Sequence, residues 1–230
     1  MTIGQRVVDL GLRGAVARPG DHICGFFADA RQRDEIVLAF LRAGLLAGDK
    51  CVCVLDGAEP VDIVRHLITS DAGDQHLSRK QLDVLRAADV YLRSERFSPA
   101  EIISFWKLVM AEVMYEGRFE LVRAVETWAL QDVRFDSQEL LVLESEMSRF
   151  LPLYPQVILC LYDIGRFGGG FVVDLLKTHP RVLVGTMIVD NPYYLTPEEL
   201  MAARQSPSPS ADEDVKELAA QCFAATTGST

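Results

Sequence analysis

The sequence has no apolar run that approaches the ~18–20 residues of a membrane-spanning helix, so no such helix is predicted. Residues 1–18 lack the charged start, the apolar centre and the cleavage site of a secretory signal. Cysteine is scarce and odd in number, five in 230 residues, which favours reduced thiols over a disulfide framework. We therefore expect a cytoplasmic protein without a membrane segment.

Residues that bind metals are few and poorly spaced for that role. The chain has four histidines. Cys51 and Cys53 are separated by one residue, which is not the C-x2–4-C spacing of structural zinc sites, and no second pair follows. Their apolar surroundings are typical of thiols that act as small buried side chains. No metal site and no cofactor are predicted.

Positive charge is also in short supply. The 23 Lys and Arg stand against 33 Asp and Glu, which gives a formal net charge of −10. An acidic chain without a basic stripe repels phosphate backbones and anionic lipid, so neither nucleic acid nor a membrane is an expected partner. No G-x-S-x-G nucleophile motif is present, and no enzyme is predicted. The acidic surface suits a protein partner with a basic face.

Apolar runs alternate along the chain with segments of helical spacing. Strands are expected at 22–27, 51–55, 85–92, 119–124, 157–162 and 182–188, the last as one strand or a hairpin. Helices are expected at 31–48, 60–69, 99–116, 137–150 and 171–177 and after Thr196. This alternation predicts an α/β fold, with a mostly parallel sheet and helices on both of its faces.

The chain is predicted to contain one domain with two flanking segments. Residues 1–18 form an N-terminal extension, and residues 19–205 form the α/β domain. The run Ser206–Ser210 (SPSPS) is a flexible break, and the rest of 206–230 is a tail or a helix.

The turn after the first strand resembles a phosphate-binding loop that has lost its chemistry. The segment Gly25–Gln32 keeps the first glycine of the G-x-x-x-x-G-K-[ST] pattern, but Ala30, Arg31 and Gln32 replace the residues that follow. Asp29 adds negative charge where a phosphate would bind. ATP hydrolysis by this loop is not expected. A plain strand-to-helix turn and retained nucleotide binding both remain open.

Several segments together resemble one family. They are Gly20–Phe27 (GDHICGFF), Glu126–Leu130 (ETWAL), Leu159–Asp163 (LCLYD), Arg166–Phe167, Lys177–Pro180 and Asn191–Tyr194. In this order they resemble the MEDS domain, the sensory domain named after methanogens, methylotrophs and the dichloromethane-responsive repressor DcmR. The resemblance implies a three-layer RecA-like core, distantly similar to the circadian-clock KaiC ATPases but with a degenerate P-loop. It also implies that the domain senses small molecules, often hydrocarbon derivatives, and signals to a regulator.

The candidate ligand-binding residues follow from the strands and from this resemblance. Trp128 would form a wall for an apolar ligand, Glu126 and Tyr162 would orient polar atoms, and the segment 26–31 would act as a lid. His22 is a ligand-recognition residue or a buried histidine bonded to the backbone. The complete predicted set is His22, Phe27, Arg31, Glu126, Trp128, Cys160 and Tyr162.

His179 is interpreted as structural. It lies just before a predicted strand, as His22 lies at the head of one. Both histidines therefore belong to the amino edge of a parallel sheet, whereas ligands in open α/β sheets usually bind at the carboxyl edge. This placement argues against a site that both histidines share with Glu126 and Trp128.

The first hypothesis is a non-enzymatic cytoplasmic sensor that binds a small molecule and signals to a separate protein. That protein would be a transcription factor, a kinase or an anti-sigma-type module, and homo-oligomer formation is left open. The alternative is a degenerate RecA-like protein that still binds a nucleotide or a nucleotide second messenger without efficient hydrolysis. A third hypothesis is a pure interaction module that docks through Trp106 or its C-terminal segment.

Overall fold

Seven strands form one sheet in the computed structural model, which describes residues 6–68, 80–92, 96–129 and 136–205. The chain divides into two compact units, residues 1–197 and 198–230, and the sheet lies in the first. In their order across the sheet, the strands are β5 (Leu82–Arg86), β4 (Lys50–Leu55), β6 (Val122–Trp128), β7 (Gln156–Asp163), β3 (His22–Phe27), β8 (Arg181–Val184) and β9 (Met187–Asp190). All neighbouring strands are parallel except β8 and β9, which form a hairpin.

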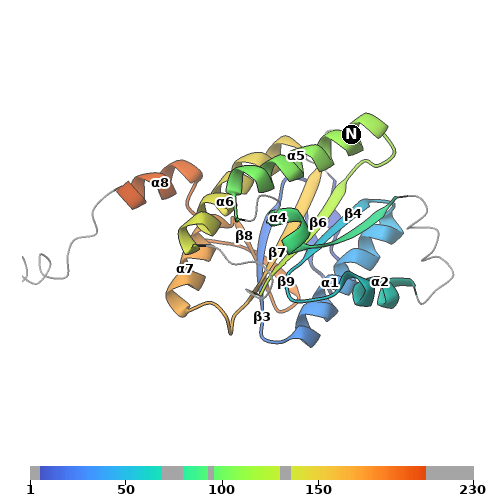
Figure 1. Cartoon of the computed structure of the whole chain (residues 1–230), viewed down its shortest axis with the longest axis horizontal. Helices are drawn as coiled ribbons and strands as arrows, with labels where there is room; N and C mark the ends of the chain where they lie inside the picture. Colours follow the sequence, from blue (N-terminus) through green and yellow to red (C-terminus); the bar gives the residue numbers. More distant parts are fainter. Residues whose placement is uncertain (1–5, 69–79, 93–95, 130–135, 206–230) are drawn as a thin grey trace, which may run out of the picture. The chain divides into compact units, whose positions relative to one another are not determined.

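Helices pack on both faces of this sheet, as the sequence predicts (Figure 1). One face is covered by α1 (Ala30–Ala47) and α2 (Pro60–Ile68). The other face, called here the α5–α6 face, is covered by α4 (Ala87–Tyr91), α5 (Pro99–Glu116), α6 (Ser137–Phe150) and α7 (Gly169–Thr178). Each face has its own cluster of buried apolar side chains, so the central strands are buried on both sides.

Local sequence signals set the ends of the longer helices. The Ser98 side chain accepts a hydrogen bond from the backbone N–H of Glu101 at the start of α5, and Gly117 ends that helix with a φ of 62°. Asp136 and Glu139 form a reciprocal capping box at the start of α6. The predicted starts of these two helices are confirmed. A short 3-10 turn, η2 (Leu151–Leu153), follows α6.

Two predicted strands differ from the structure. Residues 85–92 are not one strand, because β5 ends at Arg86 and α4 begins at Ala87. The strand predicted at 119–124 is β6, which instead runs from Val122 to Trp128. The strand continues through Glu126 and Thr127, two polar residues that the apolar pattern excludes from a strand. Both are buried, as is every other residue of β6.

A small hairpin precedes the sheet, within the segment predicted as an N-terminal extension. Its strands are β1 (Val8–Asp9) and β2 (Val16–Ala17). Val8 and Leu10 are buried in the same apolar cluster as α1. The Arg123 guanidinium donates to the Asp9 carbonyl at 2.5 Å and to the Asp49 carboxylate at 2.7 Å, which fixes the hairpin to β6.

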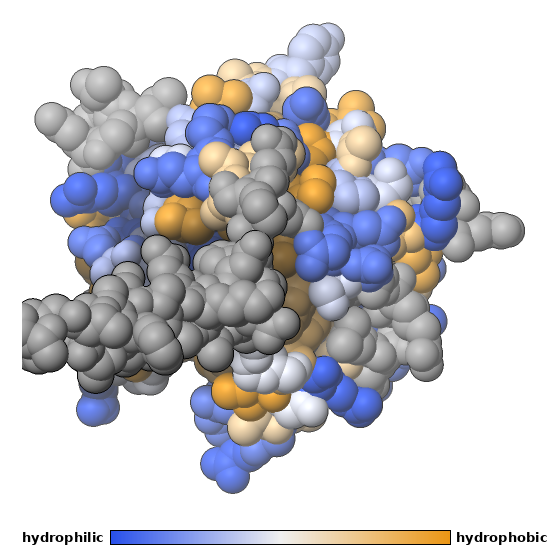
Figure 2. Space-filling model, turned by 90° about the vertical axis from the view of Figure 1, so that its left-hand side faces the viewer, coloured by the Kyte–Doolittle hydropathy of each residue, from blue (hydrophilic) through white to orange (hydrophobic). Residues whose placement is uncertain are grey.

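The second unit contains all of α8 (Pro197–Gln205) except its first residue. The predicted break at 206–210 and the tail that follows it lie outside the described residues, as do Thr69 of the predicted helix 60–69 and Leu130 of the ETWAL segment. Among the described residues, no helix combines the length and apolar character that are needed to cross a membrane. Figure 2 shows one side of the molecule, on which hydrophobic groups are interrupted by hydrophilic residues.

Candidate functional site

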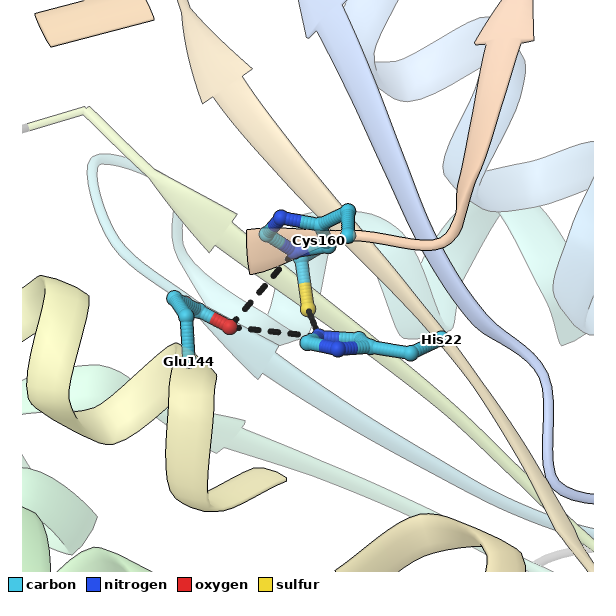
Figure 3. Close-up of side chains that lie close together, drawn as sticks. His22, Glu144 and Cys160 are labelled. Atoms are coloured by element: carbon cyan, nitrogen blue, oxygen red, sulfur yellow. Dashed lines mark hydrogen bonds and ion pairs between the residues drawn. The ribbon is translucent and has the colours of Figure 1, made fainter. Parts of the chain in front are cut away.

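Four polar side chains converge inside the α5–α6 face and are called here the buried polar cluster. His22 comes from β3, Cys160 from β7, Glu144 from α6 and His179 from the residue that ends α7. Their ligand-type atoms all lie within 4.8 Å of one another, and none of the four residues is more than 1% exposed. Figure 3 shows the side chains of His22, Glu144 and Cys160 directed toward one point between α6 and the sheet.

The strand register explains how this cluster forms. Successive side chains of a strand point to opposite faces, so His22 and Cys24 on β3, and Cys160 and Tyr162 on β7, all point to the α5–α6 face. His22 pairs with Ile158, two residues before Cys160. The imidazole spans this offset, and its Nε2 lies 3.5 Å from the Cys160 sulfur.

The hydrogen bonds of the two histidines define their protonation. Ser148 Oγ donates its single hydrogen to the Thr178 carbonyl at 2.8 Å, so it accepts from His22 Nδ1 at 2.9 Å. His179 Nδ1 lies 2.8 Å from the Leu175 carbonyl, which can only accept. Burial lowers the pKa of each histidine to about 3. Both rings are therefore neutral, with hydrogen on Nδ1 and a lone pair on Nε2.

Glu144 lies between these two lone pairs. Its Oε2 is 3.2 Å from His22 Nε2 and 3.5 Å from His179 Nε2, and it has no hydrogen-bond partner among the residues that the structure describes. Its Oε1 accepts from the Tyr162 hydroxyl at 2.7 Å. Burial raises the pKa of this carboxyl, while His179 and the Tyr162 hydrogen bond act in the opposite direction.

Glu126 extends the cluster toward α4 and α5. It pairs with Cys160 in the sheet, and its Oε2 is 3.8 Å from the Cys160 sulfur. Trp106 donates to Glu126 Oε1 at 2.7 Å, and the Tyr91 hydroxyl donates to the same oxygen. Burial, aided by the nearby Glu144 charge, raises the pKa of Glu126 to about 8. This carboxyl is therefore mostly protonated at neutral pH.

The thiol and phenol groups of the cluster are held in their neutral forms. Burial, followed by the charge of Glu144, raises the pKa values of Cys160 and Tyr162 well above their ordinary values. Among the groups of three or more His, Cys, Asp or Glu in the described residues, these four form the single one compact enough to hold an ion. The arrangement offers buried donors and acceptors, with the thiol and the phenol both protonated.

Four of the predicted site residues, His22, Glu126, Cys160 and Tyr162, lie together in or beside this cluster. Trp128 lies on the same face but farther along β6, where its ring stacks on Tyr91 at a centroid distance of 5.3 Å.

Phe27 and Arg31 lie away from the cluster. Phe27 is buried on the opposite face of the sheet, against the α1 side. The Arg31 side chain is 87% exposed and pairs with Glu35 on the surface of α1. The structure therefore does not bring these two residues to one site with His22.

Two sequence interpretations of the edges are corrected by this geometry. His22 and His179 do share a cluster with Glu126, through Cys160. The first residue of β3, His22, pairs with Ile158, the third residue of β7, and its imidazole extends along the sheet to Cys160. Cys160 in turn lies next to Glu126 on the same face of the sheet. Glu126 and Trp128, which lie beyond the strand predicted at 119–124, are within β6. His179 keeps the backbone bond of a structural residue, but its second nitrogen faces Glu144.

The expected lid does not exist as a loop. Gly25 lies within β3, where a Cβ would approach Leu161 Cδ2 to 2.8 Å, so its small size serves strand packing. Because β3 ends at Phe27 and α1 begins at Ala30, the connection has two residues. Asp29 caps α1 by accepting from the backbone N–H of Gln32 at 2.8 Å. A plain strand-to-helix turn is what the structure contains.

Four further side chains belong to this network but are not predicted from the sequence: Glu144, Ser148, Tyr91 and Trp106. Glu144 could have been found, because it falls on the apolar stripe of its helix, four residues after Leu140 and three before Met147. An acidic residue at such a position is buried and needs a partner. Tyr91 gave no comparable signal, because its segment was predicted to be a strand.

Comparison with known proteins assigns the chain to a family. A family model described as the methanogen/methylotroph, DcmR sensory domain (MEDS) matches residues 21–180. The chain is also similar to the transcriptional repressor DcmR of Methylorubrum extorquens, with 26% identity over 169 residues. That alignment covers 69% of this chain and 58% of the repressor, so the chain spans somewhat more than half the length of its relative. The chain belongs to the MEDS family of sensory domains.

Proposed function

We propose that this chain is a non-enzymatic sensory module that binds a small molecule of the hydrocarbon-derivative type and signals to a regulatory protein. The observation that carries the proposal is the MEDS match over residues 21–180, together with similarity to a transcriptional repressor. The buried polar cluster supports it, because its two neutral imidazoles, its thiol and the Tyr162 phenol suit recognition of an uncharged molecule better than acid–base chemistry.

An aromatic group beside the cluster supports a site for an apolar ligand. Phe26 and Tyr162 have ring centroids 6.0 Å apart, Tyr162 and Phe167 5.9 Å, and Phe167 stacks on Phe171 at 5.3 Å. Phe26 and Phe171 are half-buried, so these four packed rings extend from the surface of the protein to the buried side chain of Tyr162. In this proposal the rings contact the apolar part of the ligand, and Tyr162 binds its polar atom.

We further propose that the sheet is a RecA-like core that no longer binds a nucleotide. The carboxylate of Asp29 occupies the amino terminus of α1, where a phosphate would otherwise bind. Arg31, the one basic residue of the loop pattern, pairs with Glu35. These contacts disfavour the alternative of retained nucleotide binding, because a phosphate would be repelled by Asp29.

The proposed output is a change in affinity for a regulatory protein. A ligand that contacts Tyr162 would alter the bond to Glu144 of α6, and so the packing of that helix on the sheet. A net charge of −10 favours a partner with a basic face over direct contact with nucleic acid.

Tryptophan fluorescence tests this proposal. Both tryptophans of the chain, Trp106 and Trp128, are buried on the α5–α6 face. The probes are short alcohols, aldehydes and haloalkanes, titrated into the full chain. We expect at least one class to give a saturable change that is about tenfold weaker in Tyr162→Phe. The matched control is Tyr193→Phe, at an exposed tyrosine.

Two results would contradict the proposal. One is the absence of a saturable response to every probe class in the wild-type chain. The other is steady release of phosphate from ATP by the pure protein, abolished in Glu126→Gln, because that result would make the chain an enzyme.

A further inference from the structure

The buried polar cluster contains more lone pairs than hydrogens. Both histidine Nδ1–H groups are used by Ser148 and Leu175, so both Nε2 atoms present lone pairs. These lone pairs face Glu144 Oε2, which accepts no hydrogen bond from any described residue. The thiol hydrogen of Cys160 can serve one of these acceptors at a time. Facing lone pairs in a dry interior are costly unless a proton or a metal cation lies between them.

The spacing of the atoms fits a metal ion. Zinc bonds of about 2.0–2.1 Å to nitrogen or oxygen and about 2.3 Å to sulfur, at tetrahedral angles, place nitrogen and oxygen about 3.3 Å apart and nitrogen and sulfur about 3.6 Å apart. The structure has 3.2 and 3.5 Å from Glu144 Oε2 to the two Nε2 atoms. It has 3.5 Å from His22 Nε2 to Cys160 Sγ. Three edges of a tetrahedron therefore have the required length.

We propose that His22 Nε2, His179 Nε2, Glu144 Oε2 and Cys160 Sγ bind one divalent transition-metal ion of the zinc class. Binding forms a metal–thiolate bond and releases the thiol proton of Cys160 to solvent. Two neutral imidazoles, one carboxylate, one thiolate and a divalent cation sum to zero charge. A site without net charge can be buried completely, as these four residues are.

The surrounding contacts have the form expected around metal ligands. Metal-bound histidines usually donate their second N–H to a fixed acceptor, which orients the ring. Here His22 donates to Ser148, which is itself held by the Thr178 carbonyl, and His179 donates to the Leu175 carbonyl. Tyr162 holds the other oxygen of Glu144. All three nitrogen and oxygen ligands are therefore oriented before the ion binds.

Sequence spacing could not reveal this site. The ligands lie at positions 22, 144, 160 and 179 and come from two strands, one helix and the end of another helix. No two of them are close enough in sequence to form a recognisable metal motif. The sheet register and the packing of α6 bring them together. The family match does not name these four residues or a metal.

A cobalt experiment tests the site without any need to know the sensed molecule. The full chain, without an affinity tag, is unfolded and refolded with and without Co²⁺, because a fully buried site loads best while it forms. We expect one cobalt per chain by elemental analysis, together with tetrahedral cobalt absorption and a thiolate-to-cobalt charge-transfer band. Refolding with Zn²⁺ should suppress both signals.

Variants assign the ligands. Cys160→Ser should lose the charge-transfer band, and His22→Ala should weaken cobalt binding at least 100-fold. Ser148→Ala, which removes the support of His22, should weaken it about 10-fold. The matched controls are Cys24→Ser, a buried thiol on the same face outside the four ligands, and Cys222→Ser. Both should keep the wild-type spectrum.

The proposal is overturned if the refolded wild-type chain holds no stoichiometric cobalt, which would mean that a proton shared by Glu144 and the histidines fills the gap. It is also overturned if the band persists in Cys160→Ser. Should that variant fail to fold, Ser148→Ala decides, because unchanged affinity there contradicts the site. None of these results bears on ligand binding at Tyr162 as measured by fluorescence in the metal-free chain.

Discussion

Replacing Glu126 with glutamine isolates the effect of one buried carboxyl on stability. The amide keeps an oxygen that can accept from Trp106 and Tyr91, and its NH2 group can face the sulfur of Cys160. The side chain keeps its size but loses its titration. Any change in the pH dependence of unfolding therefore comes from the carboxyl itself.

The expected magnitude follows from the pKa shift of Glu126. The folded-state pKa is about 8 and the ordinary value is 4.5, so the folded state retains a proton that the unfolded state releases. Stability from this group is complete below pH 4.5 and is lost as the pH rises through 8. Between pH 5 and pH 8, the wild-type chain should lose about 3–4 kcal/mol more unfolding free energy than Glu126→Gln, from pKa values of 4.5 and about 8.

Urea unfolding, followed by tryptophan fluorescence, measures this difference. Both proteins are unfolded at pH 5, 6, 7 and 8 with a chelator present, so that metal binding does not contribute to the pH dependence. Glu112→Gln, on the exposed side of α5, is the matched control and should follow the wild type. Parallel curves for wild type and Glu126→Gln would refute the reasoning, since they would mean that Glu126 is ionised in the folded protein.

Two further predictions concern packing and helix capping. A Cβ at Gly44 would approach the Arg123 Cδ atom at 2.5 Å and the Cys51 sulfur at 2.6 Å, so Gly44→Ala should lower the unfolding free energy by about 1–3 kcal/mol. Gly170→Ala, in a helix with open space around the new Cβ, should instead be neutral or stabilise by up to about 1 kcal/mol, and equal effects in thermal unfolding would contradict this comparison. Asp136→Ala removes the capping box of α6 and should cost about 1 kcal/mol in urea unfolding, whereas an unchanged midpoint would show that tertiary contacts alone hold this helix end.

The sequence predicted those parts of the fold that depend on neighbouring residues. The capping residues Ser98 and Asp136 mark the starts of α5 and α6 because their hydrogen bonds are local. The strand predicted at 85–92 is wrong, since the mixed composition of this segment fits both a strand and a helix. There the side chain of Tyr91 bonds to Glu126, 35 residues away, and no local pattern contains that contact.

The candidate site also combines features that local sequence predicts with contacts between distant residues that it does not predict. The apolar runs placed His22, Cys160 and Tyr162 in strands and Glu126 just after a strand, and the structure places all four side chains on one face of the sheet. Their grouping depends on the stagger of β3 against β7 and on α6, which contributes Glu144 from across the layer. From the sequence, the two histidines belong to the amino edge of the sheet and Glu126 to the carboxyl edge. The sequence does not show how far β3 is shifted along β7, and this shift brings His22 close to Cys160 and Glu126.

The N-terminal hairpin has a practical consequence for work on this family. The matched segment begins at residue 21, yet Val8 and Leu10 fill space beside α1, and Asp9 accepts from the buried Arg123. A protein that begins at residue 21 would expose apolar side chains of α1 to solvent, and the buried Arg123 guanidinium would lose one hydrogen-bond acceptor. Aggregation of such a fragment would reflect the cut, and would say nothing against the capacity of the intact chain to fold.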